Sequence, residues 1–205
     1  MKPKWIFFDV GSTLVDETEA YDHRARDMIE GTNLSFSEFD KARHDFAKMG
    51  LDGNSEAIRH FGLRKTPWHS EDEKLYPDAH DALTDLYKKG YRLGIIANQN
   101  SGLEKRLEAW GIRKFFRVIV SSAEAGCTKP DRAIFELALK AAGCEAEESV
   151  MVGDRLDNDM LPDKEIGMKT VWIRTGLSKV QPLTFGKGIY DIQIESLREL
   201  TLIFE

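Results

Sequence analysis

Hydrophobic and polar residues follow two different patterns along the chain. Residues 5–8 form a short apolar, aromatic run that stops at Asp9-Val10-Gly11-Ser12, which predicts a buried strand followed by a turn. From residue 16 to about residue 62, apolar side chains recur at helical spacing in a charged background, and glycines divide this segment into roughly three helices. The polar stretch 64–77 is bounded by prolines and is expected to be a connector.

The second pattern begins after residue 77 and predicts strands that alternate with helices. Expected strands cover residues 91–97, 118–121, 149–153, 170–173 and 190–194, and expected helices cover residues 78–89, 102–110, 130–142 and 157–166, with another from residue 196. Pro130 is expected near the start of its helix, where proline is well tolerated. This order predicts an α/β fold, a Rossmann-like parallel sheet with helices on both faces, formed by residues 1–15 and 77–205. Residues 16–76 would be inserted as a small helical cap domain.

Polar side chains stand at the ends of several expected strands. Ligands of open parallel sheets bind at the carboxyl ends of the strands, so these side chains should converge. Carboxylates among them suit a hard cation such as Mg²⁺, and a cation allows a carboxylate nucleophile to approach a phosphoryl group that would otherwise repel it. The pattern therefore predicts a site for a metal and a phosphate, built from Asp9, Ala97-Asn98, Lys129, Asp154, Asp157 and Asp159.

Composition narrows the classes of function. The net charge of −6 argues against a nucleic-acid binder, although it does not exclude a small anionic substrate. No apolar run reaches membrane-spanning length or resembles a signal peptide, so we expect no membrane partner. Cys127 and Cys144 lack metal-ligand spacing and are expected to be free thiols of a cytoplasmic protein. The oligomeric state stays open.

Three motifs occur in order at these strand ends. They are Asp9-Val10-Gly11-Ser12-Thr13-Leu14, Lys129-Pro130-Asp131 and Val152-Gly153-Asp154-Arg155-Leu156-Asp157-Asn158-Asp159. Together they resemble the motifs of the haloacid dehalogenase-like superfamily, and the resemblance spans essentially the full length of the chain. The insert at residues 16–76 is similar in place and size to the small helical cap of that family.

The resemblance implies a phosphohydrolase that acts on a small phosphorylated metabolite. Asp9 would attack phosphorus and form an aspartyl-phosphate that is later hydrolysed. Lys129 would pair with Asp9 and with the substrate phosphate, and would offset charge in the transition state. The resemblance also implies Mg²⁺ as cofactor, held by Asp9, the backbone carbonyl of Gly11, Asp154 and Asp159.

Two positions depart from the pattern of this family. The aspartate that usually stands two residues after the nucleophile, and protonates the leaving group, is replaced by Gly11; such assistance is worth about 10²–10⁴-fold. The serine or threonine of the second motif is replaced by Ala97, so phosphate binding there would rest on backbone N–H groups and the Asn98 amide. We therefore expect weak turnover of alkyl phosphates and better turnover of good leaving groups. Asp16 and His23 could replace the missing acid or could be ordinary residues at a helix start.

Two other functions remain open at this point. A catalytically weak or inactive binding or regulatory protein of the same fold would account for Gly11 and Ala97. A metal-independent haloacid dehalogenase is disfavoured by the acidic cluster at residues 153–159 and by Gly11, where dehalogenases tend to place a tyrosine. Within the cluster, the helix-capping role is the interpretation we favour for Asp157.

Overall fold

The computed structural model describes residues 2–182 and 186–204. The chain divides into two compact units. The first, called the core unit here, comprises Met1–Val15, Leu75–Thr175 and Gly188–Glu205. The second, called the helical unit, comprises Asp16–Lys74 and Gly176–Lys187. Short strands β2 (Val15–Asp16) and β3 (Lys74–Leu75), which the sequence pattern did not predict, pair where the chain passes from the core unit into the helical unit and back.

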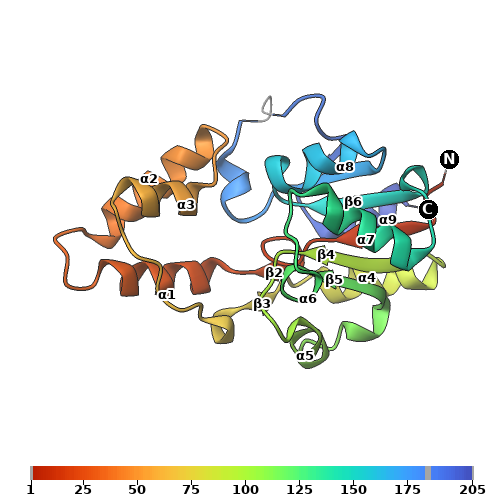
Figure 1. Ribbon diagram of the computed structural model, residues 1–205, viewed down its shortest axis with the longest axis horizontal. Helices are drawn as coiled ribbons and strands as arrows, with labels where there is room; N and C mark the ends of the chain where they lie inside the picture. Colours follow the sequence, from red (N-terminus) through yellow and green to blue (C-terminus); the bar gives the residue numbers. More distant parts are fainter. Residues whose placement is uncertain (1, 183–185, 205) are drawn as a thin grey trace. The chain divides into compact units, whose positions relative to one another are not determined.

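A parallel six-stranded sheet forms the centre of the core unit (Figure 1). Its order is β5-β4-β1-β6-β7-β8, and every neighbouring pair is parallel, which confirms the predicted α/β class. The central strand places Phe8 beside Ile95 of one neighbour and Val152 of the other. The strands are β1 (Trp5–Phe8), β4 (Arg92–Ala97), β5 (Phe116–Ser121), β6 (Ser149–Gly153), β7 (Lys169–Ile173) and β8 (Ile192–Ile194).

The alternation of side chains along β1 divides the core into two layers. Ile6 and Phe8 join the layer that includes α4 (Ala79–Lys88), α5 (Leu103–Ala109) and α9 (Leu200–Ile203), whereas Trp5 and Phe7 join the layer that includes α7 (Arg132–Ala142). All four β1 side chains are buried because helices cover both faces, which is why this strand reads as an unbroken apolar run. Shorter helical segments complete the unit: η2 (Arg113–Phe115), α6 (Ser122–Ala125), η3 (Ala146–Glu148), η4 (Leu156–Met160), α8 (Leu161–Glu165) and η6 (Leu197–Glu199).

The helical unit has a small apolar core of its own. Helices α1 (Thr18–Ile29), α2 (Phe36–Lys48) and α3 (Gly53–His60) contribute Met28, Phe39 and Ala57, all buried. Ser35 and Glu38 form a capping box at the start of α2, and the Asp52 side chain caps α3. The unit also contains the 3₁₀ turns η1 (Ser70–Asp72) and η5 (Gly176–Val180).

Two predicted helices begin or continue differently in the structure. Helix α7 starts at Arg132, because Asp131 is its N-cap and accepts a hydrogen bond from the Ala133 N–H at 2.9 Å, so Pro130 precedes the cap. The helix expected at 157–166 is instead a π-helical turn, η4, followed by the short helix α8. Among the described residues, no helix is long and apolar enough to cross a membrane.

Candidate active site

The motif that begins at Asp9 and the motif at residues 152–159 meet where β1 and β6 end. These neighbouring strands run parallel, so the residues that follow them, Asp9 and Asp154, lie at the same edge of the sheet. The Asp9 N–H donates to the Val152 carbonyl at 2.9 Å, which continues the β1–β6 ladder one residue beyond the strand. The Asp154 carbonyl accepts a hydrogen bond from the Trp172 indole at 2.8 Å, so the backbone at both positions is fixed.

Lys129 joins two of the carboxylates. Its Nζ lies 2.7 Å from Oδ1 of Asp9 and 2.5 Å from Oδ1 of Asp159. The side chains of Lys129 and Asp159 are 0% exposed, whereas 13% of the Asp9 side chain is exposed. Buried ion pairs are stable only when hydrogen bonds accompany the charges, and here one ammonium group supplies a hydrogen bond to each partner. Asp9 is thus the member of the three that solvent reaches.

The pKa values of this group follow from its burial. Burial alone would lower the pKa of Lys129, but the negative charges of Asp159 and Asp9 outweigh it and raise that pKa above its ordinary value. Burial raises the pKa of Asp159 to about 6, with Lys129 opposing the shift and the charge of Asp9 adding to it. The lysine is therefore positively charged at neutral pH, and the carboxylates carry more negative charge than it offsets.

Gly153 allows Asp159 to approach the end of β6. A Cβ atom added at this glycine would lie 2.4 Å from Oδ2 of Asp159, closer than real Cβ atoms come to other atoms. The same Oδ2 accepts a hydrogen bond from the Arg155 N–H at 3.1 Å. The π-helical turn thus places Asp159 directly against the strand end. In the sequence, this glycine is recognisable only as part of the motif at residues 152–159.

Asn98 holds the backbone of Lys129. Its Nδ2 donates to the Lys129 carbonyl at 2.9 Å, and its Oδ1 accepts from the Lys129 N–H at 2.8 Å. The amide expected to reach phosphate is therefore engaged in positioning the lysine, and Asn98 could meet a phosphate through its backbone N–H. Ala97 is buried at the end of β4.

The residues present fit a divalent metal ion. Carboxylate oxygens of Asp9, Asp154 and Asp159 lie within 4.8 Å of one another. Three carboxylates and one lysine, Lys129, leave two negative charges in excess (three minus one), which matches one divalent cation. Oxygen ligands suit the hard ions Mg²⁺ and Ca²⁺ rather than softer metals. Burial is the main cause of the raised pKa of Asp159, and the negative charge of Asp9 adds to it.

After Asp9 the backbone forms a tight turn. The N–H groups of Thr13, Leu14 and Val15 all point to the Val10 carbonyl, at 3.3, 2.9 and 3.0 Å. Ser12 has a positive φ of 53°, and its carbonyl accepts a hydrogen bond from the Thr175 hydroxyl. Gly11 opens this turn and carries no side chain, so the expected acid is missing from this position.

Comparisons with known proteins agree with this arrangement. The sequence profile of the family described as haloacid dehalogenase-like hydrolase matches residues 6–173. The chain belongs to the haloacid dehalogenase-like hydrolases. A glyceraldehyde 3-phosphate phosphatase of Pyrococcus abyssi is 31% identical over 224 residues, which cover 98% of this chain and 94% of that protein. The protein of the same name from Methanothermobacter thermautotrophicus is 32% identical, with 93% of this chain and 94% of that protein covered.

A solved structure supports the same assignment. The crystal structure of a HAD phosphatase from Thermococcus onnurineus matches this hydrolase with a TM-score of 0.66 and 26% identity, over 99% of this chain and 97% of the other. The resemblance inferred from the three motifs is therefore confirmed. This hydrolase is an enzyme of the phosphatase kind.

Three of the predicted polar residues make other contacts in this hydrolase. Asp157 is exposed and pairs with Arg155 at 2.7 Å. Asp16 belongs to the helical unit, where its Oδ1 accepts a hydrogen bond from the Thr18 N–H at 2.9 Å near the start of α1. His23 lies on α1 with its Nδ1 2.8 Å from Asp72.

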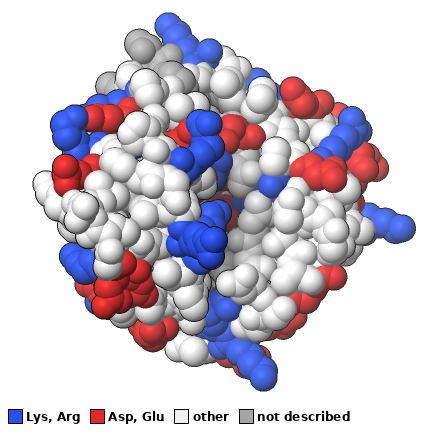
Figure 2. Space-filling model, turned by 60° about the vertical axis from the view of Figure 1, so that its left-hand side comes forward, with Lys and Arg blue, Asp and Glu red and all other residues white. Residues whose placement is uncertain are grey.

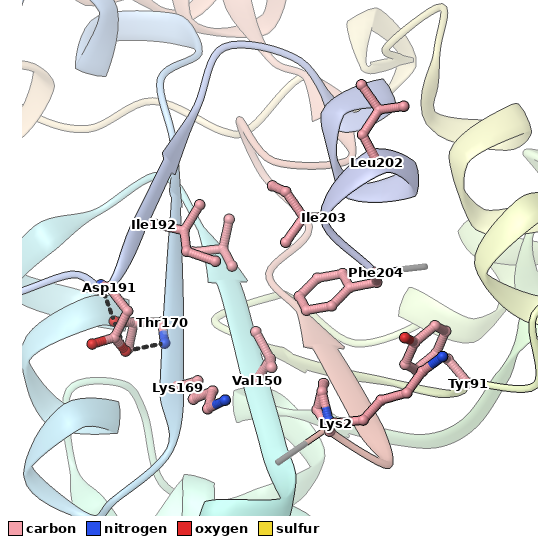
Figure 3. Close-up of a pocket in the computed structure, with 12 residues that line it drawn as sticks. Lys2, Tyr91, Val150, Lys169, Thr170, Asp191, Ile192, Leu202, Ile203 and Phe204 are labelled. Carbon is pink, nitrogen blue, oxygen red and sulfur yellow. Dashed lines mark hydrogen bonds between the residues drawn. The ribbon is translucent and has the colours of Figure 1, made fainter.

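A pocket of about 570 Å³ lies at the opposite edge of the sheet (Figure 3). It is lined by residues at the beginnings of strands, among them Lys169, Val150 and Ile192. Thr170 donates through its N–H and its hydroxyl to the Asp191 carboxylate, at 2.9 and 3.1 Å. Because substrates of parallel sheets bind at the carboxyl ends of strands, this pocket is separate from the carboxylate–lysine site.

Proposed function

We propose that this hydrolase removes phosphate from a small phosphorylated metabolite, with Mg²⁺ as cofactor and an aspartyl-phosphate at Asp9 as intermediate. The observation that carries the proposal is the contact of one buried ammonium group with two carboxylates, at 2.7 Å to Asp9 and 2.5 Å to Asp159. A fixed positive charge beside a nucleophilic carboxylate is suited to the negative charge of a transferring phosphoryl group. Lys129 would therefore bind the phosphate as well as Asp9.

The proposed reaction has two steps. A carboxylate oxygen of Asp9 attacks phosphorus, the bond between phosphorus and the substrate oxygen breaks, and the departing oxygen takes a proton from solvent. Water then attacks the phosphorus of the aspartyl-phosphate, so inorganic phosphate leaves and the Asp9 carboxylate is restored. Lys129 already binds Oδ1 of Asp9, and we assign Oδ2 as the attacking atom.

Four residues would hold the metal ion. We assign the carboxylates of Asp9, Asp154 and Asp159 and the backbone carbonyl of Gly11 to Mg²⁺. Bound there, the ion would reduce the repulsion between the Asp9 carboxylate and the phosphate. Asn98 would act as a positioning residue, because its amide grips the backbone of Lys129 on both sides.

Glyceraldehyde 3-phosphate is the first substrate to test. Phosphatases named for it are 31% and 32% identical to this chain over nearly its whole length. Acidic and basic side chains are interspersed on the face drawn in Figure 2, which suits a small substrate better than a long polyanion. The leaving group of glyceraldehyde 3-phosphate is an alkoxide, so we expect the lack of an acid at Gly11 to limit the rate of its hydrolysis.

The decisive experiment is the hydrolysis of para-nitrophenyl phosphate and glyceraldehyde 3-phosphate, with Mg²⁺ or with EDTA, by the wild type and Asp9→Asn. We expect Mg²⁺-dependent turnover that the substitution abolishes, and a phosphorylated Asp9 in wild-type protein quenched during turnover. Turnover that survives EDTA would contradict the metal assignment. A folded wild type that binds Mg²⁺ but hydrolyses neither substrate would favour a non-catalytic relative.

The substitution Gly11→Asp tests whether the missing acid limits the rate. An acid at this position should raise kcat for glyceraldehyde 3-phosphate by roughly 10²-fold, within the range of general acid catalysis. The gain for para-nitrophenyl phosphate should be much smaller, because its leaving group needs little protonation. Equal gains for both substrates would contradict the explanation, and Gly11→Asn controls for the added volume.

A further inference from the structure

A cluster of histidine and carboxylate side chains lies wholly within the helical unit and shares no residue with the proposed active site. His23 and Asp27 stand one turn apart on α1, and His69 lies in the segment that leads into η1. One ligand atom from each of these three residues can be chosen so that all lie within 4.8 Å of one another. The two imidazole rings are stacked, with centroids 3.6 Å apart and planes 10° from parallel.

Both imidazoles face the cluster with the same ring nitrogen. Nε2 of His69 lies 2.6 Å from Oδ2 of Asp27, and Nε2 of His23 lies 4.0 Å from Oδ1 of the same carboxylate. The opposite nitrogens contact other carboxylates: Nδ1 of His23 lies 2.8 Å from Asp72, and Nδ1 of His69 lies 3.1 Å from Glu71. Histidines that bind metals almost always donate their second N–H to a carboxylate or carbonyl in this way.

Neighbouring aromatic contacts hold this arrangement in place. The indole of Trp68 packs edge-on against Tyr21 of α1, with centroids 4.8 Å apart, and its Nε1 donates to Glu73 at 2.7 Å. Arg24 of α1 covers the same indole at 5.7 Å. The residue before His69 is therefore anchored to the helix that carries His23, so His69 stays close to α1 without any ligand.

The geometry points to a second divalent-metal site in this unit, formed by Nε2 of His23, Nε2 of His69 and a carboxylate oxygen of Asp27. Two imidazoles and one carboxylate are a donor set that suits Zn²⁺, and a fourth position stays open to water because 48% of the His23 side chain is exposed.

Salt bridges alone, without a metal site, explain fewer of the contacts among these histidines and carboxylates. It would place carboxylates beside imidazoles in any orientation, whereas here both Nε2 atoms face Asp27 and both Nδ1 atoms face separate carboxylates. The three carboxylates also supply negative charge that a divalent cation would offset. The donor atoms differ from the all-oxygen set of the proposed Mg²⁺ site, so the two sites should select different metals.

The test is a titration of the full chain with Zn²⁺ in excess Mg²⁺, followed by long-range ¹H–¹⁵N spectra of the histidine rings. The chain has five histidines, and we expect the ring signals of two, His23 and His69, to change and to saturate at about one equivalent of Zn²⁺. The signals of His44, His60 and His80 should stay in place. No change at equimolar Zn²⁺, or equal changes in all five rings, would overturn the proposal.

Matched variants separate this site from ordinary surface binding. His69→Gln should weaken Zn²⁺ binding at least tenfold, whereas His44→Gln should not, although His44 also has an aspartate one helical turn away at 3.4 Å. Asp72→Asn leaves all three ligands in place and should weaken binding by about 10–100-fold through the second N–H of His23. Unchanged affinity in both His69→Gln and Asp72→Asn would overturn the proposal, and either variant suffices if the other fails to fold.

Discussion

The Lys129 ammonium group is the only positive charge that the structure records in contact with the Asp9 or Asp159 carboxylate among the described residues. Its position depends on Asn98, whose amide binds the lysine backbone at both its N–H and its carbonyl. A lysine at the surface would lose part of its charge effect to water and salt. Burial preserves that effect, and the adjacent carboxylates keep the lysine protonated.

Replacement of Lys129 by methionine should reduce kcat for para-nitrophenyl phosphate by at least about 10²-fold, because a positive charge aimed at the transition state is lost while chain length is kept. Steady-state kinetics on folded protein measures this, with circular dichroism as the check on folding. The matched control is Lys164→Met, since Lys164 pairs with Asp191 at 3.0 Å on the surface. A kcat within threefold of wild type in Lys129→Met would contradict the assigned role.

Asp163 is a buried acidic residue outside the proposed metal site. The residue is buried in α8, and neither carboxylate oxygen has a hydrogen-bond partner among the described residues. Burial raises the pKa of Asp163 well above its usual value, and the nearby charge of Asp159 adds to the shift. A buried carboxyl without a partner avoids the cost of ionisation by keeping its proton.

This raised pKa makes the free energy of unfolding depend on pH. Below the unfolded pKa, near 3.8, both states hold the proton; as pH rises, the unfolded chain releases it first and folding is progressively disfavoured. We therefore expect the Tm of Asp163→Asn minus that of wild type to increase between about pH 4 and pH 7. Thermal melts of both proteins across this range measure this difference in Tm. A flat difference for Asp163→Asn would contradict the raised pKa.

At the scale of elements, the junction of β6 and the π-helical turn η4 positions the acidic residues. Gly153 ends the strand, and the turn carries Asp159 back against it. An ordinary α-helix starting at the same place would direct its side chains differently, because π and α turns close different hydrogen-bonded rings. The motif therefore depends on a backbone irregularity as well as on its acidic residues.

Gly153→Ala tests this junction. The added Cβ would lie 2.4 Å from Oδ2 of Asp159, so the carboxylate must move away from Lys129 and from the Arg155 N–H. We expect at least a tenfold loss in kcat and weaker Mg²⁺ binding, together with a loss of about 1–3 kcal/mol in stability from overpacking. Asp157→Ala, an exposed change in the same turn, should leave kcat, Mg²⁺ binding and stability near wild type. Normal Mg²⁺ affinity in Gly153→Ala would argue against Asp159 as a ligand.

At the scale of the whole molecule, the two units have separate apolar cores. The chain enters the helical unit twice, since the segment Gly176–Lys187 joins Asp16–Lys74 there. Gly53 packs closely against both segments: a Cβ atom added to it would lie 2.1 Å from the Arg43 carbonyl and 3.1 Å from a Leu177 methyl group. A larger residue at this position should disturb the helical unit alone.

Gly53→Ala should therefore lower the unfolding temperature of the helical unit more than that of the core unit. Trp68 reports on the helical unit, and the other three of the four tryptophans lie in the core unit. In ¹⁹F spectra of protein labelled with fluorotryptophan, the Trp68 signal should change at a lower temperature than the rest, with about 1–3 kcal/mol of destabilisation. Asn54→Ala is the control in the same turn. Simultaneous loss of all four signals would indicate a single cooperative unit.

Much of the fold was predictable from the sequence, because the pattern of apolar residues along the chain matches the residues that are buried in the structure. The strand at residues 5–8 has the expected bounds, since four consecutive apolar side chains are buried on both faces of the sheet. The predicted start of α7 at Pro130 was wrong. The helix begins at Arg132, because the Asp131 side chain caps it. The strands β2 and β3 have two residues each, too short for periodicity to detect.

Residue type and local spacing were enough to predict the alternation of strands and helices after residue 77 and to find the three motifs from which the proposed site is inferred. The tertiary structure decided what depends on distance between segments far apart in the chain. It bound the Asn98 amide to Lys129 and brought His69 to His23 and Asp27. Sequence position carries no information on such contacts, since close approach is fixed by packing.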